Sequence, residues 1–187
     1  YMITQTDKVS IEKAFLQSQN LFYILTNSRA FSKEYTIQYH KELIQNIIDV
    51  AKKLDMDFTI VSRSDSTLRG HYPTETQVIY DVLKKNHMHI DGEILCPYLD
   101  GIRKTENDIH YVLVNDTWVP VGKTEFANDK TFAFQSSDLK EYVEEKTNKA
   151  YLASSCISIS LSDLQDESIV VSKLNSVSEF RKVILNC

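Results

Sequence analysis

The segment Ser62–Gly70 gathers side chains that could hold a small anion. Its nine residues include two arginines, one aspartate and four hydroxyl side chains, with a glycine at the end: Ser62, Arg63, Ser64, Asp65, Ser66, Thr67, Arg69 and Gly70. Arginine offers a planar fork of donors that matches a carboxylate, and hydroxyl groups both donate and accept hydrogen bonds. Gly70 would allow close backbone approach or a positive φ. The pattern predicts a site for a sugar acid, with a polar loop held by an Asp65–Arg69 ion pair as the alternative.

The elements expected around this segment would place it at the edge of a sheet. Apolar runs and helical periodicity alternate in the first hundred residues, which predicts strands at 21–25, 58–61 and 93–95 and helices at 32–54 and from Pro73 onward. This alternation predicts βαβ units and a mainly parallel sheet. Ligands of such sheets bind at the loops that follow the strands, here 27–30, 62–72 and 97–103. Arg29 would then lie beside Arg63 and Arg69, and the start of the second helix would add free N–H groups.

The rest of the chain predicts an antiparallel excursion followed by alternating elements. Two apolar runs, 109–114 and 118–121, flank the polar residues 115–117, which is a hairpin signal. A helix is predicted at 138–147, strands at 151–159 and 169–174, and a last helix from Ser176, with Glu179 completing its capping box. The predicted fold class is α/β: a mainly parallel sheet with flanking helices in three layers, plus an antiparallel hairpin excursion.

Composition and charge exclude several classes of protein. The 187 residues, 42% of them hydrophobic, suit one large domain or a domain with a small appendage. A net charge of -5 and a pI near 5.5 provide no basic field for nucleic acid. No run of about 18 apolar residues predicts a membrane span. Three cysteines without CxxC spacing fit a reducing cytoplasm better than a disulfide scaffold or a zinc ribbon.

Other side chains could do chemistry, each with a structural alternative. His87 and His89 could share a metal ion or could lie in a solvated loop. Cys96 could be a nucleophile or a core thiol. His110 with Asp108 could form the acid–base pair of an unrelated hydrolase, or His110 could be structural. The sequence has no GxxxxGK[ST] or GxGxxG motif, so an ATP site would have to lie outside this chain.

The string Ser62–Gly70 closely resembles the signature of the four-carbon acid sugar kinase family, also catalogued as DUF1537. Further stretches resemble this family in the same order, from about Leu21 to Leu164: residues 26–30; Cys96-Pro97-Tyr98 with Arg103, Thr105, Asn107 and 108–112; residues 119–121; and residues 123–129. Several collinear motifs make the resemblance more specific than one motif would.

The resemblance implies that residues 1–187 are the N-terminal, sugar-acid-binding domain of a two-domain kinase. The family's C-terminal domain would bind ATP and Mg²⁺ and would be joined to this chain in cis. The expected reaction is phosphorylation of threonate, erythronate or 3-oxo-tetronate at the terminal hydroxyl. By resemblance, Arg29 and residues 63–66 would contact the substrate, with Thr67 and Arg69 in support. The catalytic group is not identified, and a homodimer is left open.

The chain departs from the family pattern in three respects. The family's opening strand with an Asp-Asp-Phe-Thr-Gly-type motif is not in this sequence, and no ATP-binding domain follows Cys187. We therefore expect a domain truncated at both ends, which has no kinase activity by itself. Residues 71–75 replace a more glycine-rich stretch, which implies a subfamily with a different substrate preference. The alternative is a non-catalytic module that binds a sugar acid or another small anion.

Overall fold

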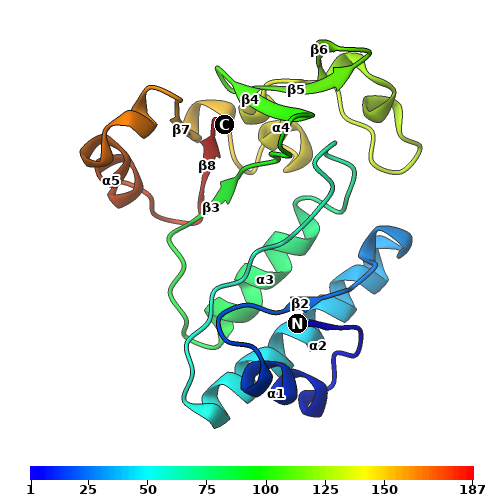
Figure 1. The fold of residues 1–187 in the computed structure, drawn as a ribbon, viewed down its shortest axis with the longest axis vertical. Helices are drawn as coiled ribbons and strands as arrows, with labels where there is room; N and C mark the ends of the chain where they lie inside the picture. Colours follow the sequence, from blue (N-terminus) through cyan, green and yellow to red (C-terminus); the bar gives the residue numbers. More distant parts are fainter. The chain divides into compact units, whose positions relative to one another are not determined.

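The computed structural model describes residues 1–187, and the chain separates into two compact units (Figure 1). Unit 1 consists of Tyr1–Arg63 and Thr74–His89. Unit 2 consists of Ser64–Pro73 and Ile90–Cys187. The segment Ser62–Gly70 therefore begins in unit 1 and continues in unit 2.

Unit 1 contains three helices and a short parallel pair of strands. These are α1 (Lys8–Gln17), α2 (Lys33–Leu54), α3 (Thr74–Lys85), β1 (Met2–Ile3) and β2 (Tyr23–Ile24). The long helix α2 packs against both α1 and α3 through an apolar stripe at helical spacing: Leu43, Ile44, Ile47, Ile48 and Ala51. The Ser32 hydroxyl accepts a hydrogen bond from the Tyr35 N–H at 3.2 Å, so the predicted N-cap of α2 is confirmed.

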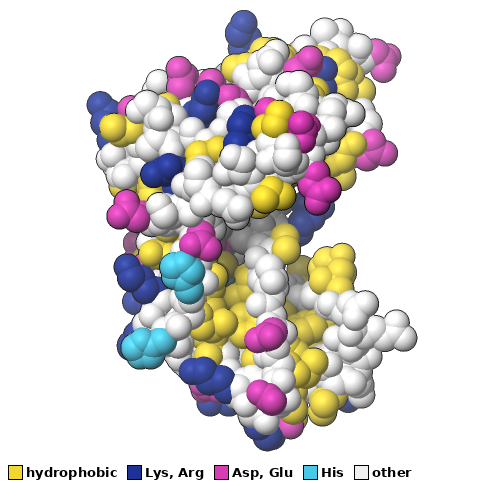
Figure 2. Space-filling model, turned by 90° about the vertical axis from the view of Figure 1, so that its left-hand side faces the viewer, with side chains coloured by type: hydrophobic (Ala, Val, Ile, Leu, Met, Phe, Trp, Pro, Cys, Tyr) yellow, Lys and Arg dark blue, Asp and Glu magenta, His cyan; other side chains and the backbone are white.

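The predicted strand at 58–61 is wrong. This segment has no regular secondary structure, with Thr59 and Val61 exposed and Phe58 and Ile60 half-buried. An alternating pattern gives a strand only where a neighbouring edge offers backbone partners, and β1 and β2 pair over two residues each. Apolar residues of β2 and its flanks, Tyr23 among them, are exposed, and Figure 2 shows hydrophobic side chains gathered on unit 1, low in the view.

Unit 2 contains a parallel sheet and an antiparallel sheet. The parallel sheet has the order β3-β8-β7, built from β3 (Gly92–Leu95), β7 (Ile157–Ile159) and β8 (Arg181–Leu185). The antiparallel sheet consists of β4 (Arg103–Glu106), β5 (Ile109–Val114) and β6 (Thr117–Pro120). The hairpin prediction is confirmed, because Asn115 and Asp116 form the β5–β6 turn with positive φ angles of 46° and 58°.

The helices of unit 2 and its core complete the fold. The α-helices are α4 (Leu139–Lys146) and α5 (Glu167–Asn175). The chain also forms 3₁₀ turns: η1 (Ser28–Ala30) in unit 1, then η2 (Val121–Lys123), η3 (Glu125–Asn128), η4 (Ala153–Ser155) and η5 (Asp163–Gln165). The core joins β5, α4 and β8 through buried side chains: Leu68, Val112, Val121, Ala127, Phe134, Leu139, Tyr142, Val143 and Ile184. The predicted mixed α/β class, with parallel pairing and an antiparallel excursion, is confirmed.

The predictions for the last forty residues need correction. Residues 169–174 lie in α5, because the Asp166 side chain caps this helix and so outweighs the strand preference of the β-branched run. The segment predicted as a helix from Ser176 instead leads into β8, Arg181–Leu185, the central strand of the parallel sheet. Glu179 and Phe180 both have φ of 57°, which no helix accepts. Of the strand predicted at 151–159, only Ile157–Ile159 pairs.

No helix of this chain combines the length and apolar character that a membrane crossing would require.

A buried ion pair lies within the parallel sheet of unit 2. Lys182 Nζ lies 2.6 Å from Glu93 Oε2, and the Lys182 side chain is 0% exposed. Its ammonium also lies 3.5 Å from the centroid of the Phe180 ring and 4.4 Å from that of Tyr151. Burial lowers the pKa of Lys182, and the Glu93 carboxylate opposes this shift. The strand pair β3–β8 therefore holds a buried lysine charge that is paired with a carboxylate.

We expect Lys182→Ala to lower the free energy of unfolding by about 3–5 kcal/mol, because it leaves Glu93 uncompensated in a buried position. Urea unfolding followed by circular dichroism measures the change. Lys104→Ala is the matched control, since it removes an ion pair of similar length, 2.8 Å, whose side chains are 32% and 46% exposed. The control should lose clearly less stability, and equal losses would contradict the assignment.

Candidate functional site

The segment 64–70 folds as a turn that is anchored in the core of unit 2. Asp65 Oδ1 accepts a hydrogen bond from the Thr67 N–H at 2.9 Å, and the Leu68 N–H donates to the Asp65 carbonyl at 2.9 Å. Leu68 has a φ of 64°, which is unusual for a residue with a Cβ. Its side chain is buried in the core cluster, and the Tyr142 hydroxyl donates to its carbonyl at 3.3 Å. Core packing therefore holds the turn in a conformation that its sequence alone disfavours.

Arg69 forms the ion pair that the sequence suggested. Its Nη2 lies 2.9 Å from Asp65 Oδ2, and its Nε lies 3.0 Å from the same oxygen and 2.9 Å from Thr67 Oγ1. Burial opposes ionisation of Asp65, but hydrogen bonds from Thr67 and the Arg69 charge outweigh it and hold the pKa of Asp65 below its usual value. The Arg69 guanidinium lies over the Phe126 ring, 4.8 Å from its centroid.

Arg103 is a functional candidate that motif reasoning left outside the predicted site. Its guanidinium lies 5.7 Å from the centroid of the same Phe126 ring. Nη1 donates to the Ile102 carbonyl at 2.6 Å, whereas Nε is buried and has no hydrogen-bond partner. Burial lowers the pKa of Arg103, Asp65 opposes the shift, and Arg69 adds to it. The signal in the sequence was the position of Arg103 at the end of the loop 97–103, one of the three loops expected to bind ligand.

Two guanidinium groups therefore lie over one aromatic ring, and one of them pairs with a carboxylate. We call this group the arginine cluster: Asp65, Thr67, Arg69, Arg103 and Phe126. The cluster carries one more positive than negative charge, although the whole chain is acidic. An anion that accepts hydrogen bonds from the guanidinium groups would balance this charge.

His110 supports the turn and does not form an acid–base pair with Asp108. Its Nε2 lies 2.7 Å from the Ser66 carbonyl, so this nitrogen carries the proton, and its Nδ1 accepts from the Thr105 hydroxyl at 3.1 Å. Burial lowers the pKa of His110, which keeps the ring neutral. Asp108 instead pairs with Lys140 at 2.8 Å and accepts from Asn186 at 2.9 Å. The hydrolase hypothesis for His110 is therefore disfavoured.

The other predicted site residues lie in different surroundings. Arg29 lies in η1 after β2, and its side chain is exposed, as are those of Ser62 and Arg63; all three belong to unit 1. Their predicted convergence with Arg69 stays a prediction, since Arg69 belongs to unit 2. In unit 2, the backbone of Gly70 lies against the hydroxyl of Ser64. Of the two alternatives considered for Gly70, the positive φ is not observed, and Leu68 has one instead.

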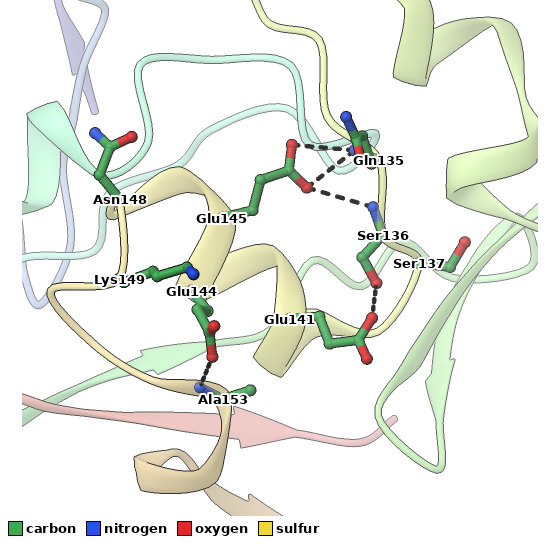
Figure 3. A pocket seen from close by; sticks show the side chains of 9 residues that line it. All are labelled: Gln135, Ser136, Ser137, Glu141, Glu144, Glu145, Asn148, Lys149 and Ala153. Atoms are coloured by element: carbon green, nitrogen blue, oxygen red, sulfur yellow. Dashed lines mark hydrogen bonds between the residues drawn. The ribbon is translucent and has the colours of Figure 1, made fainter.

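A depression of about 870 Å³ in unit 2 has the wrong charge for a sugar acid (Figure 3). Its lining includes Glu141, Glu144 and Glu145. Glu145 accepts hydrogen bonds from the N–H groups of Gln135 and Ser136, and Glu144 accepts from that of Ala153 at 2.7 Å. These carboxylates hold loops to α4, so the depression has a structural explanation.

No group of three or more His, Cys, Asp and Glu side chains in this chain could hold a metal ion. His87 and His89, the pair considered for metal binding, have exposed side chains.

Comparison with known families and structures adds independent findings. The family model of a sugar-binding N-terminal domain matches residues 3–186. A search of curated proteins gave no match. The crystal structure of a DUF1537 protein from Haemophilus influenzae has a TM-score of 0.61 at 12% identity, with 100% of this chain and 47% of that chain covered.

Two further structures also match 100% of this chain and 46% of their own. One is a DUF1537 domain of Bordetella bronchiseptica, solved with bound citrate as a domain-swapped dimer, with a TM-score of 0.56 at 13% identity. The other, from Salmonella typhimurium LT2 and provisionally described as a tRNA synthase, has a TM-score of 0.60 at 15% identity. The chain thus spans about half the length of these proteins, and the likeness shows a shared fold.

We expect Asp65→Asn to lower the free energy of unfolding at neutral pH by about 1–3 kcal/mol, because it removes the charged acceptor of Arg69. The folded-state pKa of Asp65 is depressed, so its contribution is present above the unfolded pKa of about 3.9 and is lost as pH falls through the lower folded value. The variant should therefore lose less stability than the parent protein between pH 5 and acid conditions.

Urea titrations across this pH range measure both effects. Asp116→Asn, in the exposed β5–β6 turn, makes the same chemical change outside the cluster and is the control. The role assigned to Asp65 is contradicted if both variants show the same pH dependence of stability.

Proposed function

Because the chain belongs to the family of sugar-binding N-terminal domains, we propose that it binds a four-carbon sugar acid for an ATP-dependent kinase. The substrate would be threonate, erythronate or 3-oxo-tetronate, phosphorylated on its terminal hydroxyl. The sequence resemblance to four-carbon acid sugar kinases supports this choice, as does the fold shared with DUF1537 proteins.

The observation that carries the proposal is the uncompensated charge of the arginine cluster. Arg69 is already paired with the Asp65 carboxylate, whereas Arg103 has a buried Nε without a hydrogen-bond partner. A buried donor that stays unmet costs free energy, and a carboxylate brought by a ligand would offset this cost. Thr67 and the Asp65 carboxylate would orient hydroxyl groups of the same ligand. The citrate bound to the Bordetella protein supports a carboxylate ligand for this family.

The proposed site extends to the residues that the sequence motif supplies. In unit 2, the motif residues Ser64, Asp65, Ser66, Thr67, Arg69 and Gly70 would contact the ligand. Arg29, Ser62 and Arg63 stay candidate substrate contacts on the sequence resemblance alone. In this proposal the chain binds and orients the acid, which raises the chance of productive transfer. ATP and Mg²⁺ would be bound by a C-terminal domain joined in cis, and no step of the transfer is assigned to this chain.

A small-anion binding module without catalysis is the second candidate, and the charge of the arginine cluster would serve it equally. Activity of a longer chain, rather than binding, separates the two. We also propose that this protein forms a homodimer, which the domain-swapped Bordetella structure is compatible with. Sedimentation analysis of the purified protein tests this oligomeric state.

We expect calorimetry with threonate, erythronate and 3-oxo-tetronate to show binding of at least one acid. Arg103→Ala should weaken that binding by about 1.5–3 kcal/mol, or about 10- to 150-fold in Kd, because a charged hydrogen bond is lost. Arg63→Ala should have a similar effect. Arg181→Ala removes a guanidinium group of β8, outside the cluster, and should leave Kd unchanged. Equal Kd values for the Arg103 and Arg181 variants would refute the site.

We also expect the 187-residue chain to release no ADP from ATP in a coupled assay with the acid that it binds, because it has no phosphate-binding loop motif. The calorimetric result on the same preparation shows that the domain is folded and competent to bind. Turnover that rises in proportion to protein concentration would overturn the assignment of ATP binding to another domain.

A further inference from the structure

Two cysteines meet beside the parallel sheet of unit 2. Cys96 directly follows β3, and Cys187 lies two residues after the end of β8. These strands are neighbours in parallel register, with Leu95 opposite Ile184. The two Sγ atoms lie 3.5 Å apart. The Cys96 side chain is exposed and that of Cys187 is partly exposed, so small reagents can reach the pair.

From this geometry we propose that Cys96 and Cys187 form a redox-active dithiol, which closes to an intramolecular disulfide on reaction with a small-molecule disulfide such as glutathione disulfide. A disulfide bond is about 2.05 Å long, so the sulfurs must approach by about 1.5 Å. The backbone of Cys187 is fixed by two hydrogen bonds with Thr105, of 2.8 and 2.9 Å. Side-chain rotation at Cys96 and Cys187 supplies the remaining movement.

The surroundings assign different roles to the two thiols. A hydrogen bond with Cys187 lowers the pKa of Cys96, to about 6, and the same interaction raises the pKa of Cys187. Cys96 is therefore the attacking thiolate at neutral pH, and Cys187 resolves the intermediate. The third cysteine contrasts with this pair, because burial raises the pKa of Cys156 to about 11.

The reaction balances with one molecule of glutathione disulfide as the oxidant. The Cys96 thiolate attacks one sulfur, the glutathione S–S bond breaks, and one glutathione thiolate leaves and takes up a proton. Cys187 then loses its proton and attacks the Cys96 sulfur of the mixed disulfide, which releases the second glutathione. The two cysteines lose two electrons and two protons, and these appear in two molecules of reduced glutathione.

The test is to incubate the reduced protein with glutathione disulfide, block the remaining thiols by alkylation, and map the peptides by mass spectrometry. We expect a peptide linking Cys96 to Cys187, while Cys156 is recovered alkylated. Cys156→Ser should give the same linked peptide. Cys187→Ser should stop at a glutathione adduct on Cys96. Adducts on Cys96 and Cys187 without a link, or a link to Cys156 or to a second molecule, would overturn the proposal.

A second readout tests the pairing without oxidation. The rate of Cys96 alkylation by iodoacetamide should reach half its maximum near pH 6 in the parent protein. In Cys187→Ala, which removes the donor, this midpoint should move toward about pH 8.5, the ordinary value for a thiol. Circular dichroism confirms that the variant is folded. An unchanged midpoint in a folded variant contradicts the interaction between the two thiols.

Discussion

Leu68 is the point through which unit 2 fixes the segment 64–70. Its backbone has a positive φ that a leucine avoids, yet its side chain is buried and its carbonyl is bonded to the Tyr142 hydroxyl. The free energy of burying an apolar side chain, about 1.5–3 kcal/mol, is large enough to offset the cost of the left-handed conformation. The turn therefore presents Asp65, Thr67 and Arg69 on one side because Leu68 is anchored on the other.

The cations that unit 2 removes from solvent have two different kinds of surroundings. Lys182 has its own carboxylate, Glu93, and lies against two aromatic rings, so its charge is compensated within the protein. Arg69 and Arg103 lie against one ring, and the one carboxylate of the cluster, Asp65, is paired with Arg69. A buried cation that has its own carboxylate forms a structural ion pair. Where guanidinium groups outnumber carboxylates, a ligand can supply the missing negative charge. This contrast separates the candidate site from the rest of the unit.

Local chemistry determined what could be predicted from the sequence. The Ser32 cap, the hairpin turn and the Asp65–Arg69 pair depend on neighbours within a few residues, and each is present. Strand β8 depends on insertion between β3 and β7, which are distant in sequence, so the capping-box pattern at Ser176 was misleading. Arg103 belongs to the cluster because the folded chain brings its guanidinium to the Phe126 ring. These residues are far apart in sequence, so no local sequence pattern predicts this contact.

The shared fold and the local charge support different parts of the functional argument. At 12–15% identity, the likeness to the solved structures shows a shared fold. One fold can support many different activities. The depression beside α4 is lined by glutamates that already accept backbone hydrogen bonds, so it would repel a carboxylate. The arginine cluster has an excess of positive charge instead. The proposal that a sugar acid binds at the cluster therefore rests on the sign of the cluster's charge and on the unpartnered Nε of Arg103, rather than on the volume of a cavity.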